Sequence, residues 1–295
     1  MSGPDDIFAV LRGHRPQITG EEARLIQEII HAHCGVSHGM DSEFFLERRL
    51  GPRLDALGLS SYREYYHYLR YDPSGPSELE ELIERITTHE TYFFREQYQL
   101  DAFVEEVLPA VADRNRRSRD LNIWSAGCST GEEVYTIAML ILEAGGFRDW
   151  NVRVAGSDIS RKVLAKAREA VYGPYSFRTT EESIRRKYFD EVGGQYRLRE
   201  AVRAMCSFGQ LNLMQTERFN VIGACDVIFC RNVLMYLSQS ARQQVVRAFY
   251  DVLRPGGWLL LGHSESLLNV TTRFDLAHLK KDLVYRKPLT GEVNR

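Results

Sequence analysis

The sequence predicts an α/β protein whose larger part is a doubly wound parallel sheet. From about Asn122 onward, short apolar runs alternate with longer stretches of helical spacing. The predicted strands are LNIWSA, NVRVAGSD, CDVIFC and GWLLLGHSE, and the predicted helices are EEVYTIAMLILEAG, SRKVLAKAREAVY and SARQQVVRAFYDVLRPGG. Such alternation indicates parallel strands joined by crossover helices. In this class, ligands bind at the carboxyl ends of the strands, where the strand order reverses.

Two stretches of this part depart from the alternation. The segment over about 173–204 is too long for a helix-to-strand connection, and FDEVGGQYRLRE within it has the pattern of a hairpin that turns at Gly193-Gly194. We therefore expect a small inserted β-subdomain there. The final run, DLVYRK, follows a strand without an intervening helical pattern, so we expect it to return antiparallel.

The first part of the chain is predicted to be helical. Three capping boxes, Thr19–Glu22, Ser61–Glu64 and Ser77–Glu80, each precede a run with helical apolar spacing. The stretch SEFFLERRLGPRLDALGL is also amphipathic, and Gly51-Pro52 is expected to kink or split its helix. No lysine occurs before Lys162, and the first 85 residues carry more acids than arginines. This shift in composition predicts a boundary near residue 86.

Composition excludes several classes of protein. The chain has 295 residues with 44% hydrophobic residues, enough for one large or two smaller domains, and its net charge of -2 gives no global attraction to nucleic acid or anionic membranes. No apolar run approaches the roughly 18 residues of a membrane span, and the N-terminus lacks signal-peptide order. Five cysteines without CxxC spacing indicate reduced thiols and no zinc site. We expect a cytoplasmic monomer without a metal.

The stretch IWSAGCSTGEEVY indicates which cofactor the sheet binds. A strand enters a turn that contains Gly127 and Gly131, and Glu132 and Glu133 open the next helix. The GxGxxG spacing of a dinucleotide site is absent, and two carboxylates would oppose a pyrophosphate at the helix N-terminus. A cationic cofactor without phosphate, S-adenosylmethionine, fits better. Carboxylates in a first helical turn also interact favourably with the helix dipole, so an ordinary capping role stays open for either glutamate.

Asp158 closes the next predicted strand, in NVRVAGSD, where it could accept hydrogen bonds from ribose hydroxyls. An acid at this place would serve a NAD site equally well. The LRPGG stretch before a final strand pair, with its antiparallel last strand, favours the methyltransferase version of the fold.

Six motifs occur in an order that resembles one family. They are ITTHETYFFRE, WSAGCSTGEEVY, GSDIS, LNLM, FCRNVLMYL and GHSESL. The chain resembles the chemoreceptor glutamate methyltransferases of bacterial chemotaxis, the CheR family, over nearly its whole length. The resemblance implies an N-terminal helical domain (1–86), a linker with the first helix of the catalytic domain (87–121), and a Rossmann-like S-adenosylmethionine-dependent methyltransferase domain (122–290) that carries the β-subdomain.

The resemblance also implies which residues form the site. The implied cofactor contacts are His89, Thr91, Arg95, Gly127, Glu133, Asp158, Asn212, Leu213, Arg231 and Asn232. His89 stands where many relatives carry asparagine. Arg95 is expected to orient a carboxylate, and Tyr236 to line the path of the methyl group. A strand-end salt bridge is the alternative role for Arg231, and a core position is the alternative for Tyr236.

The implied reaction is methyl transfer to a glutamate side chain, giving a methyl ester and S-adenosylhomocysteine. A glutamate carboxylate, with a pKa of about 4.3, is already ionised at neutral pH and needs no general base. The implied substrate is a chemoreceptor cytoplasmic helix. Arg48, Arg49 and Arg53 are the candidates for docking it, although they could form an ordinary solvated face. Some relatives bind a receptor C-terminal pentapeptide through a glycine-bearing loop of the β-subdomain. In this chain that loop is only EVGGQY, which is short for such binding.

Other functions compete with this one. The chain could be a signalling adaptor that binds the cofactor but transfers little methyl, or a dinucleotide-dependent enzyme on a similar fold. Nucleic acid is a disfavoured substrate because the arginine-rich helix lies in an otherwise acidic region without interleaved stacking aromatics.

Overall fold

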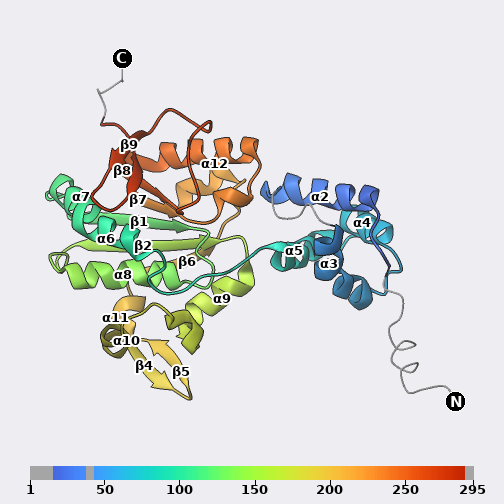
Figure 1. Cartoon of the computed structure of the whole chain (residues 1–295), viewed down its shortest axis with the longest axis horizontal. Coiled ribbons are helices and arrows are strands. Elements are labelled where there is room, and N and C mark those ends of the chain that lie inside the picture. Colours follow the sequence, from blue (N-terminus) through green and yellow to red (C-terminus); the bar gives the residue numbers. More distant parts are fainter. Residues whose placement is uncertain (1–15, 38–42, 290–295) are drawn as a thin grey trace. The chain divides into compact units, whose positions relative to one another are not determined.

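The computed structural model describes residues 16–37 and 43–289. The chain divides into two compact units, Met1–Thr88 and His89–Arg295 (Figure 1). Among the described residues, no helix combines the length and the apolar character that crossing a bilayer requires.

The first unit consists of α2 (Gly20–Cys34), α3 (Glu43–Leu57), α4 (Tyr62–Tyr71) and α5 (Gly75–Ile86). Its core is formed by apolar side chains that repeat at helical spacing, among them Ile26, Ile30, Leu46, Leu50, Leu54, Tyr62, Tyr65 and Leu82. The helical prediction for this part is therefore confirmed.

The predicted helix starts of this unit have different outcomes. Thr19 and Glu22 form the complete reciprocal capping box. Ser61 accepts the Glu64 amide, but the Glu64 carboxylate turns to the Ser60 amide at 2.7 Å. The third box is wrong, because α5 already begins at Gly75. Pro76 lies in the first turn, where its fixed φ suits a helix and its missing N–H is not needed.

Of the two outcomes expected at Gly51-Pro52, a kink or a split of the helix, the split is wrong. α3 runs through Pro52 as one helix. Leu46, Leu50 and Leu54 lie on one face and are at most 1% exposed, so their burial offsets the hydrogen bond that proline removes.

The second unit is built on a seven-stranded sheet with the order β6-β2-β1-β7-β8-β10-β9. Its strands are β1 (Asp120–Ala126), β2 (Asn151–Asp158), β6 (Cys206–Gln210), β7 (Cys225–Cys230), β8 (Leu253–Leu261), β9 (Asp275–His278) and β10 (Leu283–Arg286). The first five are parallel, while β10 pairs antiparallel with both β8 and β9. The doubly wound sheet and its antiparallel last strand are confirmed.

The order of the strands reverses at β1. From β1 the chain proceeds outward to β2 and β6, and then returns to the other side of β1 for β7 and β8. The crossover helices are α8 (Glu132–Ala144), α9 (Arg161–Glu169) and α12 (Gln239–Val252), and Figure 1 shows α8 and α12 on opposite sides of the sheet. Before β1 the chain forms α6 (Gln97–Ala102), a π-helical turn (Phe103–Val107) and α7 (Leu108–Arg114). The reversal brings together the carboxyl ends of β6, β2, β1 and β7.

A second, three-stranded antiparallel sheet lies between α9 and β6 in the sequence. It contains β3 (Val171–Tyr172), β4 (Phe189–Val192) and β5 (Gln195–Leu198), in the order β3-β5-β4. Gly193 and Gly194 have φ angles of 60° and 76°, the left-handed pair that a two-residue hairpin turn requires. The predicted hairpin is confirmed. The insertion also contains a 3₁₀ turn (Pro174–Phe177), α10 (Glu182–Tyr188) and α11 (Glu200–Arg203).

An aromatic cluster attaches this insertion to the segment that follows His89. The rings of Phe93 and Phe177 stack with centroids 5.0 Å apart, and Phe189 lies edge-on to both. The Phe93 amide donates to the Ser176 carbonyl at 2.9 Å. The segment with the ITTHETYFFRE motif is thus fixed to the small sheet by packing.

Candidate active site at the strand ends

The glycine turn after β1 is shaped by contacts within the protein. Gly127 has a φ of 83°, and a Cβ there would lie 2.4 Å from Val233 Cγ2. Its amide and that of Cys128 donate to the Ser157 carbonyl at 2.8 and 2.9 Å, which joins the turn to the end of β2. Gly127 is therefore required by its backbone conformation and by its packing against the segment that follows β7.

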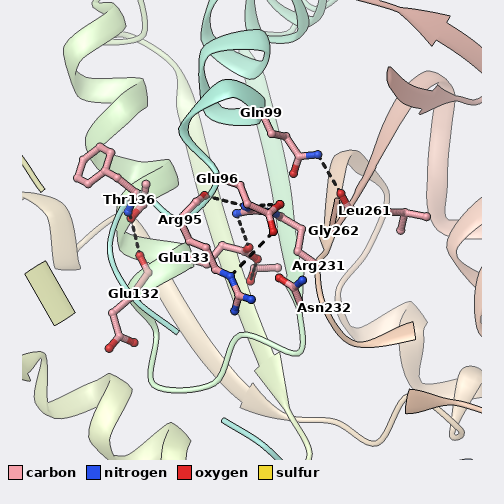
Figure 2. Close-up of polar contacts among 12 residues, drawn as sticks. Arg95, Glu96, Gln99, Glu132, Glu133, Thr136, Arg231, Asn232, Leu261 and Gly262 are labelled. Atoms are coloured by element: carbon pink, nitrogen blue, oxygen red, sulfur yellow. Dashed lines mark hydrogen bonds and ion pairs between the residues drawn. The ribbon is translucent and has the colours of Figure 1, made fainter. Parts of the chain in front are cut away.

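The two glutamates after this turn face different surroundings. Glu132 is buried and accepts the hydroxyls of Thr130 and Ser176 at 2.6 and 3.0 Å. Burial raises the pKa of the Glu132 carboxyl above its ordinary value. In Figure 2 this carboxylate points away from the group formed by Glu96, Glu133 and Arg231. Only Glu133 faces the site.

Arg231 follows β7 and connects three parts of this group. It donates to Glu96 at 3.0 Å, to Glu133 at 3.1 Å and to the Arg95 carbonyl at 2.7 Å (Figure 2). Its side chain is only 3% exposed. Burial opposes its charge, but the carboxylates of Glu133 and Glu96 outweigh burial and raise the pKa of the guanidinium. In turn, Arg231 outweighs the burial of Glu96 and lowers the pKa of that carboxyl.

The sequence-based alternative for Arg231, a salt bridge at a strand end, is therefore present. Glu96 was not predicted, although the motif ITTHETYFFRE ends on it. Its ion pair joins residues 135 positions apart in the chain. Among the described residues, the buried Nε of Arg231 has no hydrogen-bond partner. One donor of this guanidinium is thus available to a ligand.

The segment from His89 to Glu96 lies against the glycine turn. The Ser129 hydroxyl donates to the His89 carbonyl at 3.0 Å, and the Phe94 amide donates to Thr136 Oγ1 at 3.2 Å. Arg95 is half-buried and donates to the Glu90 carbonyl at 2.9 Å. Thr91 is also half-buried in this segment. The structure thus brings His89 next to the turn after β1, and Thr91 and Arg95 follow it in the same segment.

Asp158 ends β2 and is buried beside the same turn. Its carboxylate accepts the amides of Ser129 at 2.9 Å and Ser160 at 3.0 Å. The carboxylate therefore lies at the end of β2, directly beside the glycine turn that follows β1. On the neighbouring strand end, after β6, Asn212 is buried, accepts the Met214 amide at 3.0 Å and precedes the half-buried Leu213.

The segment after β7 contains Asn232 and Tyr236. Asn232 has a left-handed φ of 58°, and Tyr236 is half-buried in a 3₁₀ turn (Leu234–Tyr236). The Asn232 amide donates to Glu265 at 2.7 Å. Glu265 was not predicted as a site residue, although the motif GHSESL contains it. The strand predicted over GWLLLGHSE ends at Leu261, so Glu265 lies in the turn that follows.

The charges at these strand ends suit a cation better than a pyrophosphate. Four carboxylates, those of Glu96, Glu133, Asp158 and Glu265, accompany the guanidiniums of Arg95 and Arg231. An excess of negative charge attracts a sulfonium and an ammonium, whereas the donor at Arg231 Nε and the half-buried Arg95 suit a carboxylate. The side chains present therefore fit S-adenosylmethionine.

The three candidate docking arginines have different environments in the first unit. Arg48 and Arg49 line a cavity of about 530 Å³ together with Phe45, Glu84 and Arg85. Arg53 instead forms an ion pair with the buried Glu78, with Nε 2.8 Å from the carboxylate. Hydrogen bonding to Glu78 raises the pKa of Arg53. Arg53 is thus occupied within the protein, and Arg85 is a cavity residue that was not predicted.

Two family models match consecutive parts of the chain. The all-alpha domain of CheR methyltransferases matches residues 21–87, and their SAM-binding domain matches residues 89–283. The chain belongs to the CheR methyltransferase family. The resemblance read from the six motifs is confirmed, as are the fold class and S-adenosylmethionine as the cofactor. The dinucleotide-dependent alternative is wrong.

Named CheR relatives match along nearly the whole chain. "Chemotaxis protein methyltransferase 2" of Vibrio cholerae is 35% identical, over 93% of this chain and 96% of its own length. The chemotaxis protein methyltransferase of Borreliella burgdorferi is 32% identical over 94% and 95%, and that of Escherichia coli 33% over 86% and 87%. As a member of the CheR family, this chain is an S-adenosylmethionine-dependent methyltransferase.

Proposed function

We propose that this CheR-family enzyme methylates glutamate side chains on the cytoplasmic helices of chemoreceptors, as part of chemotactic adaptation. The observation that carries this proposal is the match, over more than nine-tenths of the chain, to proteins named chemotaxis protein methyltransferases. We further propose that it acts as a cytoplasmic monomer, with a helical domain over 1–86, a linker and first catalytic helix over 87–121, and a catalytic domain over 122–290.

The strand-end residues are proposed to hold the cofactor. Asp158 would accept the ribose hydroxyls, and Asn212 with Leu213 would contact the adenine side of the site. Glu133 would face the ammonium group. His89, Thr91 and Gly127 would contact the cofactor at the glycine turn. Arg231 would contact the cofactor carboxylate through its Nε, which is buried without a partner among the described residues. Asn232 would complete this set from the segment after β7.

Bound there, S-adenosylmethionine supplies an electrophilic methyl group on a positively charged sulfur. The protein's task is to bring a glutamate oxygen in line with that methyl group and to exclude water from the carboxylate. We propose that Arg95 orients the substrate carboxylate through its half-buried guanidinium. Tyr236 would line the path of the methyl group and donate a hydrogen bond. Neither residue needs to accept a proton, because the nucleophile is already ionised at neutral pH.

Docking is proposed to use the cavity of the first unit. Arg48 and Arg49 would contact acidic side chains of the receptor helix, with Arg85 beside them. Arg53 would support this surface through its ion pair with Glu78 instead of contacting the receptor. A receptor C-terminal pentapeptide would contribute little, because the β4–β5 hairpin turns within two residues.

The test is transfer of labelled methyl from S-adenosylmethionine to a receptor cytoplasmic fragment, with and without its terminal pentapeptide. We expect label that mild base releases as methanol, since an ester is cleaved and a methylamine is not. Binding of S-adenosylhomocysteine without any transfer to the fragment would contradict the proposal and favour a cofactor-binding adaptor. Base-stable label would contradict glutamate as the acceptor.

A further inference from the structure

The Glu265 carboxylate accepts four backbone amides, three from the segment after β7 and one from the turn after β8. Glu265 Oε1 accepts the amides of Val233 at 2.9 Å and Met235 at 3.0 Å. Glu265 Oε2 accepts those of Asn232 at 2.7 Å and Gly262 at 2.8 Å. These are charge-assisted bonds, and together they use the full acceptor capacity of a carboxylate.

The backbone of this segment is irregular. Asn232 is held at a φ of 58°, a backbone conformation that residues other than glycine adopt rarely. The 3₁₀ turn that follows spans only Leu234–Tyr236. The amides of Asn232, Val233 and Met235 therefore obtain from Glu265 the acceptor that a regular strand or helix would provide through its own carbonyls.

Gly262 allows the close approach that these bonds require. A Cβ at Gly262 would lie 2.8 Å from the amide nitrogen and from Nδ2 of Asn232, and 2.9 Å from Glu265 Oε2. The Glu265 amide donates to the Gly262 carbonyl at 2.9 Å, which folds the turn after β8 back toward the end of β7. The shape of this contact thus depends on the glycine and on the carboxylate together.

We infer that Glu265 is a positioning residue for methyl transfer: through three amide hydrogen bonds its carboxylate fixes the segment over 231–236, and a fourth, from Gly262, holds the carboxylate in its own turn. That segment contains Arg231 and Asn232 at its start and Tyr236 at its end. This inference rests on the roles proposed above for those three residues. A loose segment would misplace cofactor contacts and the methyl path at once.

Two variants disturb the contact in different ways, and a third is the matched control. Glu265→Gln keeps the shape but replaces one acceptor oxygen by a donor that faces amide donors. Gly262→Ala keeps the carboxylate but forces a Cβ between it and Asn232. Glu106→Gln makes the same chemical change at a carboxylate that accepts one backbone amide, that of Lys280 at 2.8 Å, far along the chain from residues 231–236.

Three quantities are measured in the full chain, well below the unfolding temperature of each variant. They are the hydrogen exchange of a peptide covering 231–237, the Kd for S-adenosylhomocysteine, and kcat on the receptor fragment at saturating cofactor. For Glu265→Gln we expect faster exchange confined to this peptide and to Gly262, and a Kd weaker by about tenfold. We expect kcat to fall by about 100-fold, the loss that a shift of about 1 Å in reacting groups can cause. Gly262→Ala should reproduce these effects, Glu265→Asp should recover part of them, and Glu106→Gln should show none.

The inference is overturned if Glu265→Gln lowers only the unfolding temperature and leaves exchange, Kd and kcat as in the unchanged protein. It is also overturned if exchange becomes faster while Kd and kcat stay constant, because the segment would then need no positioning. A failure of the proposed function is recognised separately. In that case the wild-type protein methylates no receptor fragment. The hydrogen exchange of the 231–237 peptide and the affinity for S-adenosylhomocysteine still decide the role of Glu265.

Discussion

Arg231 Nη1 lies 3.1 Å from Glu133 Oε2, and Arg231 Nη2 lies 3.0 Å from Glu96 Oε2, so one buried guanidinium pairs with two carboxylates. The pair with Glu133 joins the end of β7 to the start of α8 across the point where the strand order reverses. The pair with Glu96 joins the same strand end to the segment before β1. Three parts of the site thus depend on one side chain.

Arg231→Met should therefore destabilise the second unit and weaken cofactor binding together. Removing one partner of a buried ion pair leaves uncompensated charge, which costs about 3–5 kcal/mol of unfolding free energy. Urea unfolding and the Kd for S-adenosylhomocysteine measure the two effects. Arg231→Lys is the comparison, since one ammonium cannot reproduce the spacing of the guanidinium donors. Unchanged affinity in a folded Arg231→Met protein would contradict the role of Arg231 at the cofactor.

Replacement of each neighbouring glutamate by glutamine should affect the affinity for S-adenosylhomocysteine differently. Glu133→Gln should weaken S-adenosylhomocysteine binding, because it removes the charge that faces Arg231 and the proposed ammonium. Glu132→Gln should leave binding nearly unchanged, because the Glu132 carboxyl is buried among hydroxyls. Isothermal titration of both variants provides the comparison. Equal losses of affinity would contradict the division between these two residues.

Glu132 should also make stability depend on pH. Burial raises the pKa of its carboxyl in the folded state above the ordinary 4.5. The folded state then binds the proton more tightly than the unfolded state does, so the free energy of unfolding falls as pH rises from about 4.5 through the folded pKa. Glu132→Gln should remove that part of the decline. Chemical unfolding at several pH values in both proteins measures it, and parallel profiles would refute the effect.

Most of the second unit could be predicted because its strands and helices follow local patterns. β7 is buried along its whole length and appears in the sequence as the apolar run CDVIFC. β9 was missed because its four residues, Asp275–His278, alternate between half-buried and exposed and form part of a sheet edge. Ser77 was misplaced because the capping pattern says nothing about Pro76, whose ring favours an earlier helix start.

The gathering of candidate residues at the strand ends could be predicted where a motif marks such an end, as at Glu133, Asp158 and Arg231. Sequence alone could not separate Glu132 from Glu133, because adjacent helical residues point about 100° apart and packing decides which one is buried. Arg53 and Glu78 lie 25 positions apart, and Glu96 and Arg231 lie 135 apart. Pairs at such separation have no local pattern, so these partners could be found only from the fold.

A buried ion-pair cluster at the opposite end of β7 should govern stability without affecting the site. Asp226 is fully buried and pairs with Arg114 and Arg254, and it accepts the Asn122 amide at 2.8 Å. Asp226→Asn should lower the unfolding free energy by about 3–5 kcal/mol. Glu182→Gln, which removes an exposed pair with Arg186, should change it by less than about 0.5 kcal/mol. Urea unfolding gives both values, and S-adenosylhomocysteine affinity should stay constant below the transition.

The arginines of the first unit should separate into docking and structural residues. Arg48→Glu and Arg49→Glu place negative charge at the cavity that both line, so the KM for an acidic receptor fragment should rise about tenfold or more. Raising the salt concentration should reduce the difference from the unchanged protein, because screening weakens attraction between exposed charges. S-adenosylhomocysteine affinity should not change. Arg53→Gln should instead destabilise the first unit, because Glu78 would stay buried without its cation. A larger KM effect from Arg53→Gln than from Arg48→Glu, in folded proteins, would reverse this assignment.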